Sequence, residues 1–195
     1  EDLVCHESPV SLYLVVPPSD VSRTRPLVRL LINQIGRRLT ETLNPEEGEG
    51  AAARRRLLFM MDEFPTLGRL DFFQTQLAYL AGYGIQAFLI VQDLSQLYAA
   101  YGTNESIVSN CHVRVAFAPN KVETARLLSE MAGIMTVRKA RRMYSGNRLS
   151  PWLSHVMESE EESQRPLITP DEVLRLPEDN AIVFVAGHRP IWAMK

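Results

Sequence analysis

Lysine and cysteine are the scarce residue types in this chain. Of its 195 residues only Lys121, Lys139 and Lys195 are lysines, and none of them follows a glycine. A phosphate-binding loop of the pattern G-x-x-x-x-G-K-[ST] is therefore absent from the sequence. The two cysteines, Cys5 and Cys111, lie far apart and lack metal-ligand spacing, so we expect a reduced protein without a disulfide framework.

Long apolar runs and a strong net charge are missing as well. The longest apolar runs, near residues 57–61 and 87–91, fall far short of the roughly 20 residues that span a bilayer. The charges nearly balance, with 21 Lys and Arg against 23 Asp and Glu, so any nucleic-acid contact must be local. The chain starts at Glu1 without a signal pattern, and we expect an excised segment that folds as one compact unit.

The apolar pattern alternates between strand-like runs and helical periodicity. Short apolar runs predict strands, and i, i+3, i+4 spacing predicts helices. The expected strands are residues 11–16, 57–61, 87–91 and 113–116, and the expected helices are 27–39, 70–81, 94–100, 121–132 and 170–176. This order predicts an α/β fold, a mostly parallel, doubly wound sheet with helices on both faces. Two closing strands, 181–185 and 191–193, are expected to pair antiparallel.

Two segments depart from this alternation. Residues 44–53 (NPEEGEGAAA) combine proline, glycine and acidic residues without a large apolar side chain, so we expect a mobile loop. Residues 134–166 change character, because a basic stretch at 136–142 is followed by an acidic one at 157–164. We expect a hairpin or a flexible excursion there.

A pair of carboxylates follows the apolar run at residues 57–61. That run continues directly into Asp62 and Glu63, at the strand end where open α/β sheets bind ligands. In a nucleoside triphosphatase the first such carboxylate helps to hold Mg²⁺, and the second orients and deprotonates the attacking water. Asp62 is thus a candidate magnesium and nucleotide ligand and Glu63 a candidate catalytic base. The alternative is an acidic strand end before a turn.

Gln92 follows the next predicted strand, 87–91, and is the second candidate at the same edge. A polar side chain beside a carboxylate-bearing strand is suited to sense a terminal phosphate or to position water. The alternative is an amide that caps the next helix or lies on the surface.

Several longer segments resemble one family. These segments are DEFPTLGRLDFF (62–73), AGYGIQ (81–86), VQDLSQL (91–97), NCHVRVAFAPN (110–120), RPLITPDEVLRLP (165–177) and FVAGHRPI (184–191). Together they resemble the TraG-type conjugative coupling proteins, from about residue 11 to the end of the chain. The resemblance is far more specific than an acidic pair alone.

The resemblance implies a RecA-like domain of the P-loop ATPases, in a hexamer that uses ATP and Mg²⁺. Such a protein links a DNA-processing complex (the relaxosome) or secreted protein substrates to a type IV secretion channel, at the cytoplasmic face of the inner membrane. This chain resembles the later half of that domain. We therefore expect the fold to be incomplete, because the phosphate-loop strand and the membrane helices would lie upstream, and the chain alone to be inactive.

Carried over to this sequence, the resemblance assigns magnesium binding and water activation to Asp62 and Glu63 and a sensor-like role to Gln92. The arginine that a neighbouring subunit supplies is harder to place, because some relatives carry a basic residue where this chain has Ala81-Gly82-Tyr83-Gly84. Arg69 and Arg114 are the nearest candidates, and ordinary ion pairing is the alternative for both.

Two basic clusters are candidate nucleic-acid contacts. The first is residues 54–56, and the second comprises Arg138, Lys139, Arg141 and Arg142, near the possible stacking surfaces of Tyr144 and Trp152. Charge runs are more often solvated surface. His112, beside Cys111 before an apolar run, is expected to be structural.

Two other functions compete with the ATPase motor. The segment would be a docking module for relaxosome or effector proteins, with the excursion around residues 143–164 as its surface and no chemistry of its own. An FtsK-type DNA translocase shares the expected fold but fits the quoted segments less well.

Overall fold

The computed structural model describes the backbone of residues 2–5, 8–41, 55–145 and 155–194, and the side chains of these residues except Asp2 and 139–161. The predicted loop at 44–53 therefore lies outside the described residues. The chain forms two compact units, Glu1–Cys111 and His112–Lys195, where its composition led us to expect one. No described helix is both long enough and apolar enough to cross a membrane.

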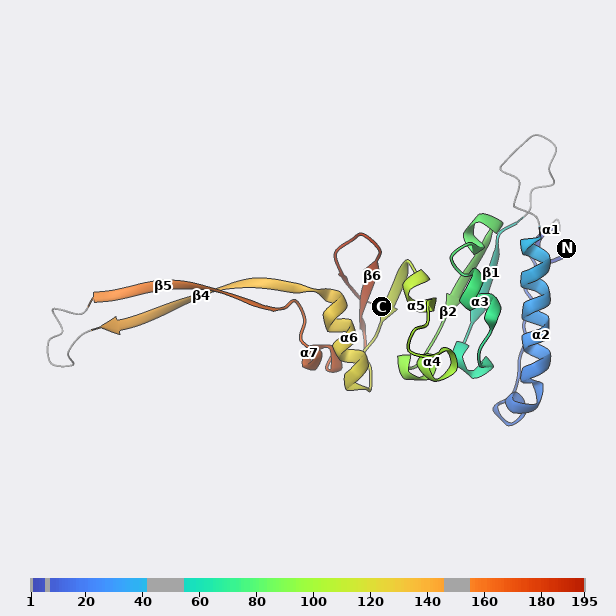
Figure 1. Ribbon diagram of the computed structural model, residues 1–195, viewed down its shortest axis with the longest axis horizontal. Coiled ribbons are helices and arrows are strands. Elements are labelled where there is room, and N and C mark those ends of the chain that lie inside the picture. Colours follow the sequence, from blue (N-terminus) through green and yellow to red (C-terminus); the bar gives the residue numbers. More distant parts are fainter. Residues whose placement is uncertain (1, 6–7, 42–54, 146–154, 195) are drawn as a thin grey trace, which may run out of the picture. The chain divides into compact units, whose positions relative to one another are not determined.

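The first unit is built on a parallel pair of strands. β1 (Leu57–Met61) pairs with β2 (Ile85–Leu89), as expected for strands joined by a helical connection. The helices are α1 (Asp2–Cys5), α2 (Val21–Thr40), α3 (Asp71–Gln76), α4 (Leu94–Tyr101) and α5 (Ile107–Asn110), with 3-10 turns at Pro18–Asp20, Phe64–Leu67 and Leu80–Tyr83. Figure 1 shows β1, β2, α3 and α2 running alongside one another.

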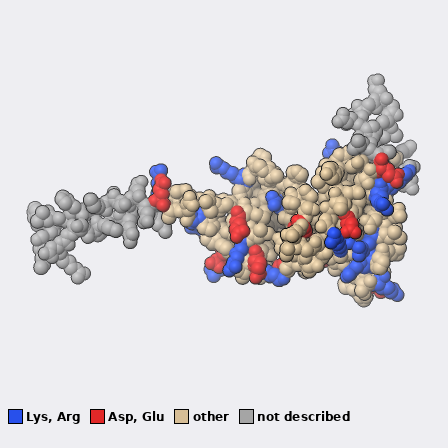
Figure 2. Space-filling model, in the orientation of Figure 1, with Lys and Arg blue, Asp and Glu red and all other residues tan. Residues whose placement is uncertain are grey.

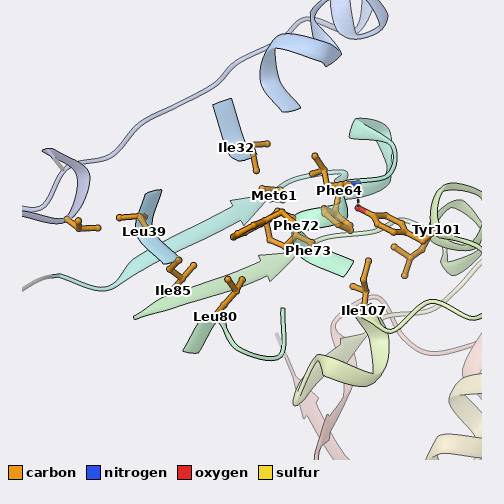
Figure 3. Close-up of a cluster of buried hydrophobic side chains, with 13 residues drawn as sticks. Ile32, Leu39, Met61, Phe64, Phe72, Phe73, Leu80, Ile85, Tyr101 and Ile107 are labelled. Atoms are coloured by element: carbon orange, nitrogen blue, oxygen red, sulfur yellow. Dashed lines mark hydrogen bonds between the residues drawn. The ribbon is translucent and has the colours of Figure 1, made fainter. Parts of the chain in front are cut away.

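One face of this sheet holds the core of the first unit. Leu57, Phe59 and Met61 alternate along β1 and pack into the same cluster as residues of α2 and α3. The buried members labelled in Figure 3 are Ile32, Leu39, Met61, Phe64, Phe72, Phe73, Leu80, Ile85, Tyr101 and Ile107. α2 approaches α3 closely at Gly36, where an added Cβ would lie 2.4 Å from the Phe72 ring.

The opposite face of the same sheet is exposed, which corrects the prediction that β1 is covered on both sides. Leu58 and Met60 of β1 and Phe88 of β2 are each more than half exposed. The apolar run at 57–61 was compatible with two covered faces, but the described helices pack on one of them. Both faces of the sheet therefore carry apolar side chains, although the described helices cover only one face.

Residues 11–16, predicted as a strand, pair with no strand in the described structure. Tyr13 and Val15 are 80% and 86% exposed. The branched apolar composition of this run favours a strand, but a strand also needs a neighbour to accept and donate its backbone hydrogen bonds.

The helix predicted at 70–81 is shorter in the structure. α3 ends at Gln76, and the chain continues in i to i+3 turns, with Tyr79 N–H donating to the Gln76 carbonyl and Gly82 N–H to the Tyr79 carbonyl. These tighter turns lead to Gly84, whose positive φ of 71° ends the segment and starts β2. β2 consequently begins two residues earlier than predicted.

The second unit contains an antiparallel sheet of order β3-β6-β7, made of β3 (Val113–Ala116), β6 (Asn180–Val185) and β7 (Ile191–Met194). The predicted antiparallel pairing of the last two strands is confirmed. β3 was expected to extend the parallel sheet, and this was wrong: it pairs antiparallel with β6. α6 (Val122–Ala132) and α7 (Pro170–Leu174) cover one face around Leu128, Val173 and Phe184.

The segment at 134–166 is a long antiparallel hairpin. β4 (Ile134–Ser145) and β5 (His155–Pro166) pair along their whole length, and Leu167 N–H donates to the Gly133 carbonyl at the base, at 2.9 Å. Of the two alternatives that the sequence left open, the backbone follows the hairpin.

Candidate active site

The acidic pair lies in a turn that the backbone of Ile90, the residue after β2, holds on both sides. Ile90 N–H donates to the Met61 carbonyl, and Phe64 N–H donates to the Ile90 carbonyl, both at 2.9 Å. Asp62 and Glu63 therefore occupy the two positions between these bonds, at the carboxyl end of β1. Asp62 is exposed and Glu63 is half-buried. Both carboxylates lie at the strand edge where the sequence predicted them.

Glu63 has a left-handed backbone conformation, with φ 52° and ψ 53°. Among the described residues it is the only non-glycine residue with positive φ. Its carbonyl accepts hydrogen bonds from the Thr66 N–H, at 3.0 Å, and from the Thr66 hydroxyl. This conformation costs a residue with a side chain about 1–2 kcal/mol. Such strain is typical of functional sites and persists only where the surroundings enforce it.

The loop that follows the pair is fixed by residues distant in sequence. Tyr101 of α4 accepts a hydrogen bond from the Leu70 N–H at 3.0 Å, and Arg29 of α2 donates to the Arg69 carbonyl at 2.6 Å. The Phe64 ring stacks on Tyr101, with centroids 5.5 Å apart and an interplanar angle of 14°. Sequence reasoning missed both Tyr101 and Arg29, because nothing in their local pattern points to a loop 31 or 40 residues away.

Gln92 lies two residues beyond Ile90 and is exposed. The cap of α4 is its neighbour Asp93, whose carboxylate accepts a hydrogen bond from the Ser95 N–H at 2.7 Å. The alternative that Gln92 caps this helix was therefore wrong. Gln92 follows closely after Ile90, whose backbone binds the residues on either side of the acidic pair. The sensor-like role of Gln92 stays a prediction.

The two arginine candidates differ in environment. Arg69 is exposed and pairs with Asp71 at 2.9 Å, an exposed ion pair of the ordinary kind. Arg114 is half-buried on β3 of the second unit, and its Nε has no hydrogen-bond partner among the described residues. Ordinary ion pairing thus accounts for Arg69 and leaves Arg114 unexplained.

The basic strand β4 is opposed by an acidic strand. Arg138 pairs with Glu162 at 3.0 Å, and the backbone register places Lys139 opposite Glu161 and Arg142 opposite Glu158. Arg141 lies opposite Ser159. Three of the four basic positions thus face an acidic position across the strand pair, and the nucleic-acid contact predicted for this cluster stays a prediction. In the first cluster Arg55 and Arg56 are exposed, and Arg54 lies outside the described residues.

A larger basic surface was missed in the sequence. The 20-residue helix α2 carries five arginines, at positions 23, 25, 29, 37 and 38, and no acidic residue. Figure 2 shows blue side chains along this part of the molecule, while both signs are mixed elsewhere on the visible face. The sequence itself shows this feature, because residues 21–40 contain only positively charged side chains among their charged residues.

The residues at the edge of the first sheet fit a magnesium nucleotide only in part. Carboxylate oxygens are ligands that Mg²⁺ accepts, and it often uses one or two carboxylates together with substrate phosphates. No group of three or more His, Cys, Asp or Glu that would hold a metal alone occurs among the described residues. The described part of the first unit contains no lysine to neutralise phosphates. This edge thus offers carboxylates suited to a metal ion but, among the described residues, no lysine for the phosphates.

Comparisons with known proteins point to one family. The model of the family described as Type IV secretory system Conjugative DNA transfer matches residues 2–195. The conjugal transfer protein TraG of Escherichia coli is 44% identical over 208 residues, which cover 98% of this chain and 33% of that protein. The protein VirD4 of Agrobacterium fabrum is 32% identical, covering 92% of this chain and 26% of its own length.

Solved structures of a bacterial conjugative coupling protein share the fold. TrwBdeltaN70 in complex with sulphate has a TM-score of 0.73 at 19% identity and covers 96% of this chain and 41% of that chain. TrwB in complex with ADP and Mg²⁺ has a TM-score of 0.67 at 19% identity, covering 90% and 37%. The predicted α/β fold is thereby confirmed as the fold of these coupling proteins, and the resemblance to TraG-type proteins is confirmed by the sequence relatives. The chain spans about a third of the length of its curated TraG relatives and belongs to the family of conjugative DNA transfer proteins of type IV secretory systems.

Proposed function

We propose that this chain is the water-activating part of an ATPase domain in a conjugative coupling protein. The observation that carries the proposal is the strained backbone of Glu63, held between two hydrogen bonds to Ile90 at the carboxyl end of β1. A strained carboxylate at this edge of a sheet is suited to chemistry, because strain without a function would be lost by a simple substitution to glycine.

In the proposed site Asp62 helps to hold Mg²⁺ and Glu63 takes a proton from the attacking water. The bound magnesium nucleotide supplies the phosphoryl group, and a phosphate loop elsewhere in the longer protein contributes the amides and the lysine that this chain lacks. Glu63, half-buried and fixed through its backbone, keeps its carboxylate in place for that proton. Gln92 lies at the same edge and positions water or senses the terminal phosphate.

The proposed partners follow from the family. We propose that the longer protein assembles as a hexamer at the cytoplasmic face of the inner membrane. It would pass relaxosome-bound DNA or secreted proteins to the type IV secretion channel. Arg114 is half-buried and its Nε has no partner among the described residues, so it is the better of the two candidates for an arginine that completes a neighbouring site.

The substitution Glu63→Gln in the full-length protein tests the proposal. The amide preserves shape and removes basicity, so nucleotide binding should persist while hydrolysis slows by about 10²- to 10⁴-fold, the contribution of a positioned base. Glu130→Gln, an exposed position on α6, is the matched control and should hydrolyse ATP at the original rate. Unchanged turnover in Glu63→Gln would show that another residue activates the water, and would favour the docking function.

A further inference from the structure

We infer that Tyr101 of α4 is a positioning residue for Glu63, acting through Phe64 and Leu70. This inference rests on the proposed function, because it assigns Tyr101 a part in the same hydrolysis. Tyr101 and Glu63 are separated in sequence by more than a third of the length of the first unit, and no motif in the sequence connects the two residues.

Tyr101 contacts both ends of the segment that follows the acidic pair. Its hydroxyl accepts the hydrogen bond from Leu70 N–H at 3.0 Å, drawn as a dashed line in Figure 3. Its ring stacks on Phe64. Phe64 and Leu70 are both fully buried, and Tyr101 is 5% exposed. One side chain of α4 therefore holds residues 64 and 70 at once.

The hydroxyl has a specific task in this contact. Leu70 precedes α3, where the first backbone N–H groups of a helix lack partners within the helix. A buried N–H without a partner is costly, so the tyrosine hydroxyl satisfies a group that a phenylalanine would leave unpaired. Burial raises the pKa of Tyr101, so the oxygen that accepts this bond belongs to a neutral hydroxyl.

Phe64 transmits this constraint to Glu63. Its N–H is bound to the Ile90 carbonyl, and its ring lies between Tyr101 and Phe73, which it meets edge to face at 5.5 Å. Because both the backbone and the ring of Phe64 are fixed, the preceding peptide cannot rotate to relax Glu63 into a right-handed conformation. Phe64, the next residue, thus holds the backbone of Glu63 in its strained conformation.

The test compares two tyrosines of one helix in the full-length protein. Tyr101→Phe keeps the ring and removes the hydroxyl. Tyr98→Phe makes the same chemical change three residues earlier, where the hydroxyl forms no hydrogen bond within the described residues. Because misplacing a catalytic group by about 1 Å can cost around 100-fold in rate, Tyr101→Phe should lower kcat by at least about tenfold. KM for ATP should stay within about twofold, and Tyr98→Phe should leave both parameters within about twofold.

A double-mutant cycle separates positioning from a merely structural role. In the Glu63→Gln background, Tyr101→Phe should lower the residual rate by less than about twofold, because the group that it positions is already gone. Equal losses in both backgrounds, or no loss in either, would overturn the inference. If Glu63→Gln itself leaves hydrolysis unchanged, the proposed function fails and the inference fails with it. If only Tyr101→Phe is silent, the proposed function stands alone.

A second variant guards against a folding defect in the first. Phe64→Leu removes the stacked ring and keeps the bond between the Tyr101 hydroxyl and Leu70. It should lower kcat in the same way, again only when Glu63 is present. Amide hydrogen exchange supplies a readout besides activity: the Leu70 N–H should lose protection in Tyr101→Phe, while that of Phe64, bound to Ile90, should remain protected. Retained protection of Leu70 would contradict the inference.

Discussion

The left-handed backbone at Glu63 predicts an unusual order of stability among substitutions. Glycine adopts φ 52° and ψ 53° without penalty, whereas alanine keeps the strain of about 1–2 kcal/mol. Glycine also gains roughly 0.5–1 kcal/mol of extra freedom in the unfolded chain, which opposes this gain. With the middle of each range, the difference leaves Glu63→Gly more stable than Glu63→Ala by about 0.75 kcal/mol. Neither variant retains the carboxylate, so the comparison isolates the backbone.

Urea denaturation of both variants, followed by circular dichroism, measures the difference. With a slope of about 1–3 kcal/mol per molar urea, the midpoint of Glu63→Gly should lie about 0.2–1 M above that of Glu63→Ala. The control is Thr75, an exposed position inside α3, where Thr75→Gly should be less stable than Thr75→Ala by about 1 kcal/mol. If Glu63→Gly is no more stable than Glu63→Ala, the backbone of Glu63 is not strained and no longer supports the proposed function.

Three further predictions concern packing, pH and activity. Gly36→Ala should destabilise the protein by about 1–3 kcal/mol in thermal unfolding, despite the higher helix propensity of alanine, because its Cβ would lie 2.4 Å from the buried Phe72 ring. At α7 the backbone N–H of Thr169 lowers the pKa of Glu172. The carboxylate of Glu172 therefore stabilises the fold above pH 4.5, and this contribution is lost as the pH falls through the lowered pKa. In a pH series, the unfolding midpoints of Glu172→Gln and of the parent should converge at acidic pH. The 195-residue chain alone should show negligible ATP turnover in a phosphate-release assay, since it lacks the phosphate loop. Robust magnesium-dependent hydrolysis would contradict the proposal that this chain holds only the water-activating part of the site.

Local chemistry made part of this molecule predictable. The apolar run before Asp62 predicted β1 and its acidic end, and the helical spacing at 94–100 and 121–132 predicted α4 and α6 to within two residues. These features depend on neighbours in the sequence, where periodicity and composition are informative.

Pairing between distant segments was not predictable in the same way. The run that forms β3 was predicted as a strand from the same kind of pattern as residues 57–61, and neither run indicates which strand it pairs with. In the structure β3 pairs antiparallel with β6, far along the chain. The same holds for the bond between Tyr101 and Leu70. It also holds for the left-handed Glu63, because glutamate is not among the residues that are enriched in that conformation. Such features arise from tertiary contacts that override local preference.

Two adjacent methionines lie on opposite faces of β1, so their oxidation can report which face of the strand is accessible. Met60 is 65% exposed and Met61 is 7% exposed, although they are neighbours in sequence and share one backbone. Peroxide converts accessible methionine to the sulfoxide, so Met60 should oxidise first while Met61 serves as an internal reference within the same peptide. In the longer protein, the ratio of the two sulfoxides would record whether another segment covers the outer face of the sheet. The strand thus allows its own surroundings to be measured by mass spectrometry without a label or a mutation.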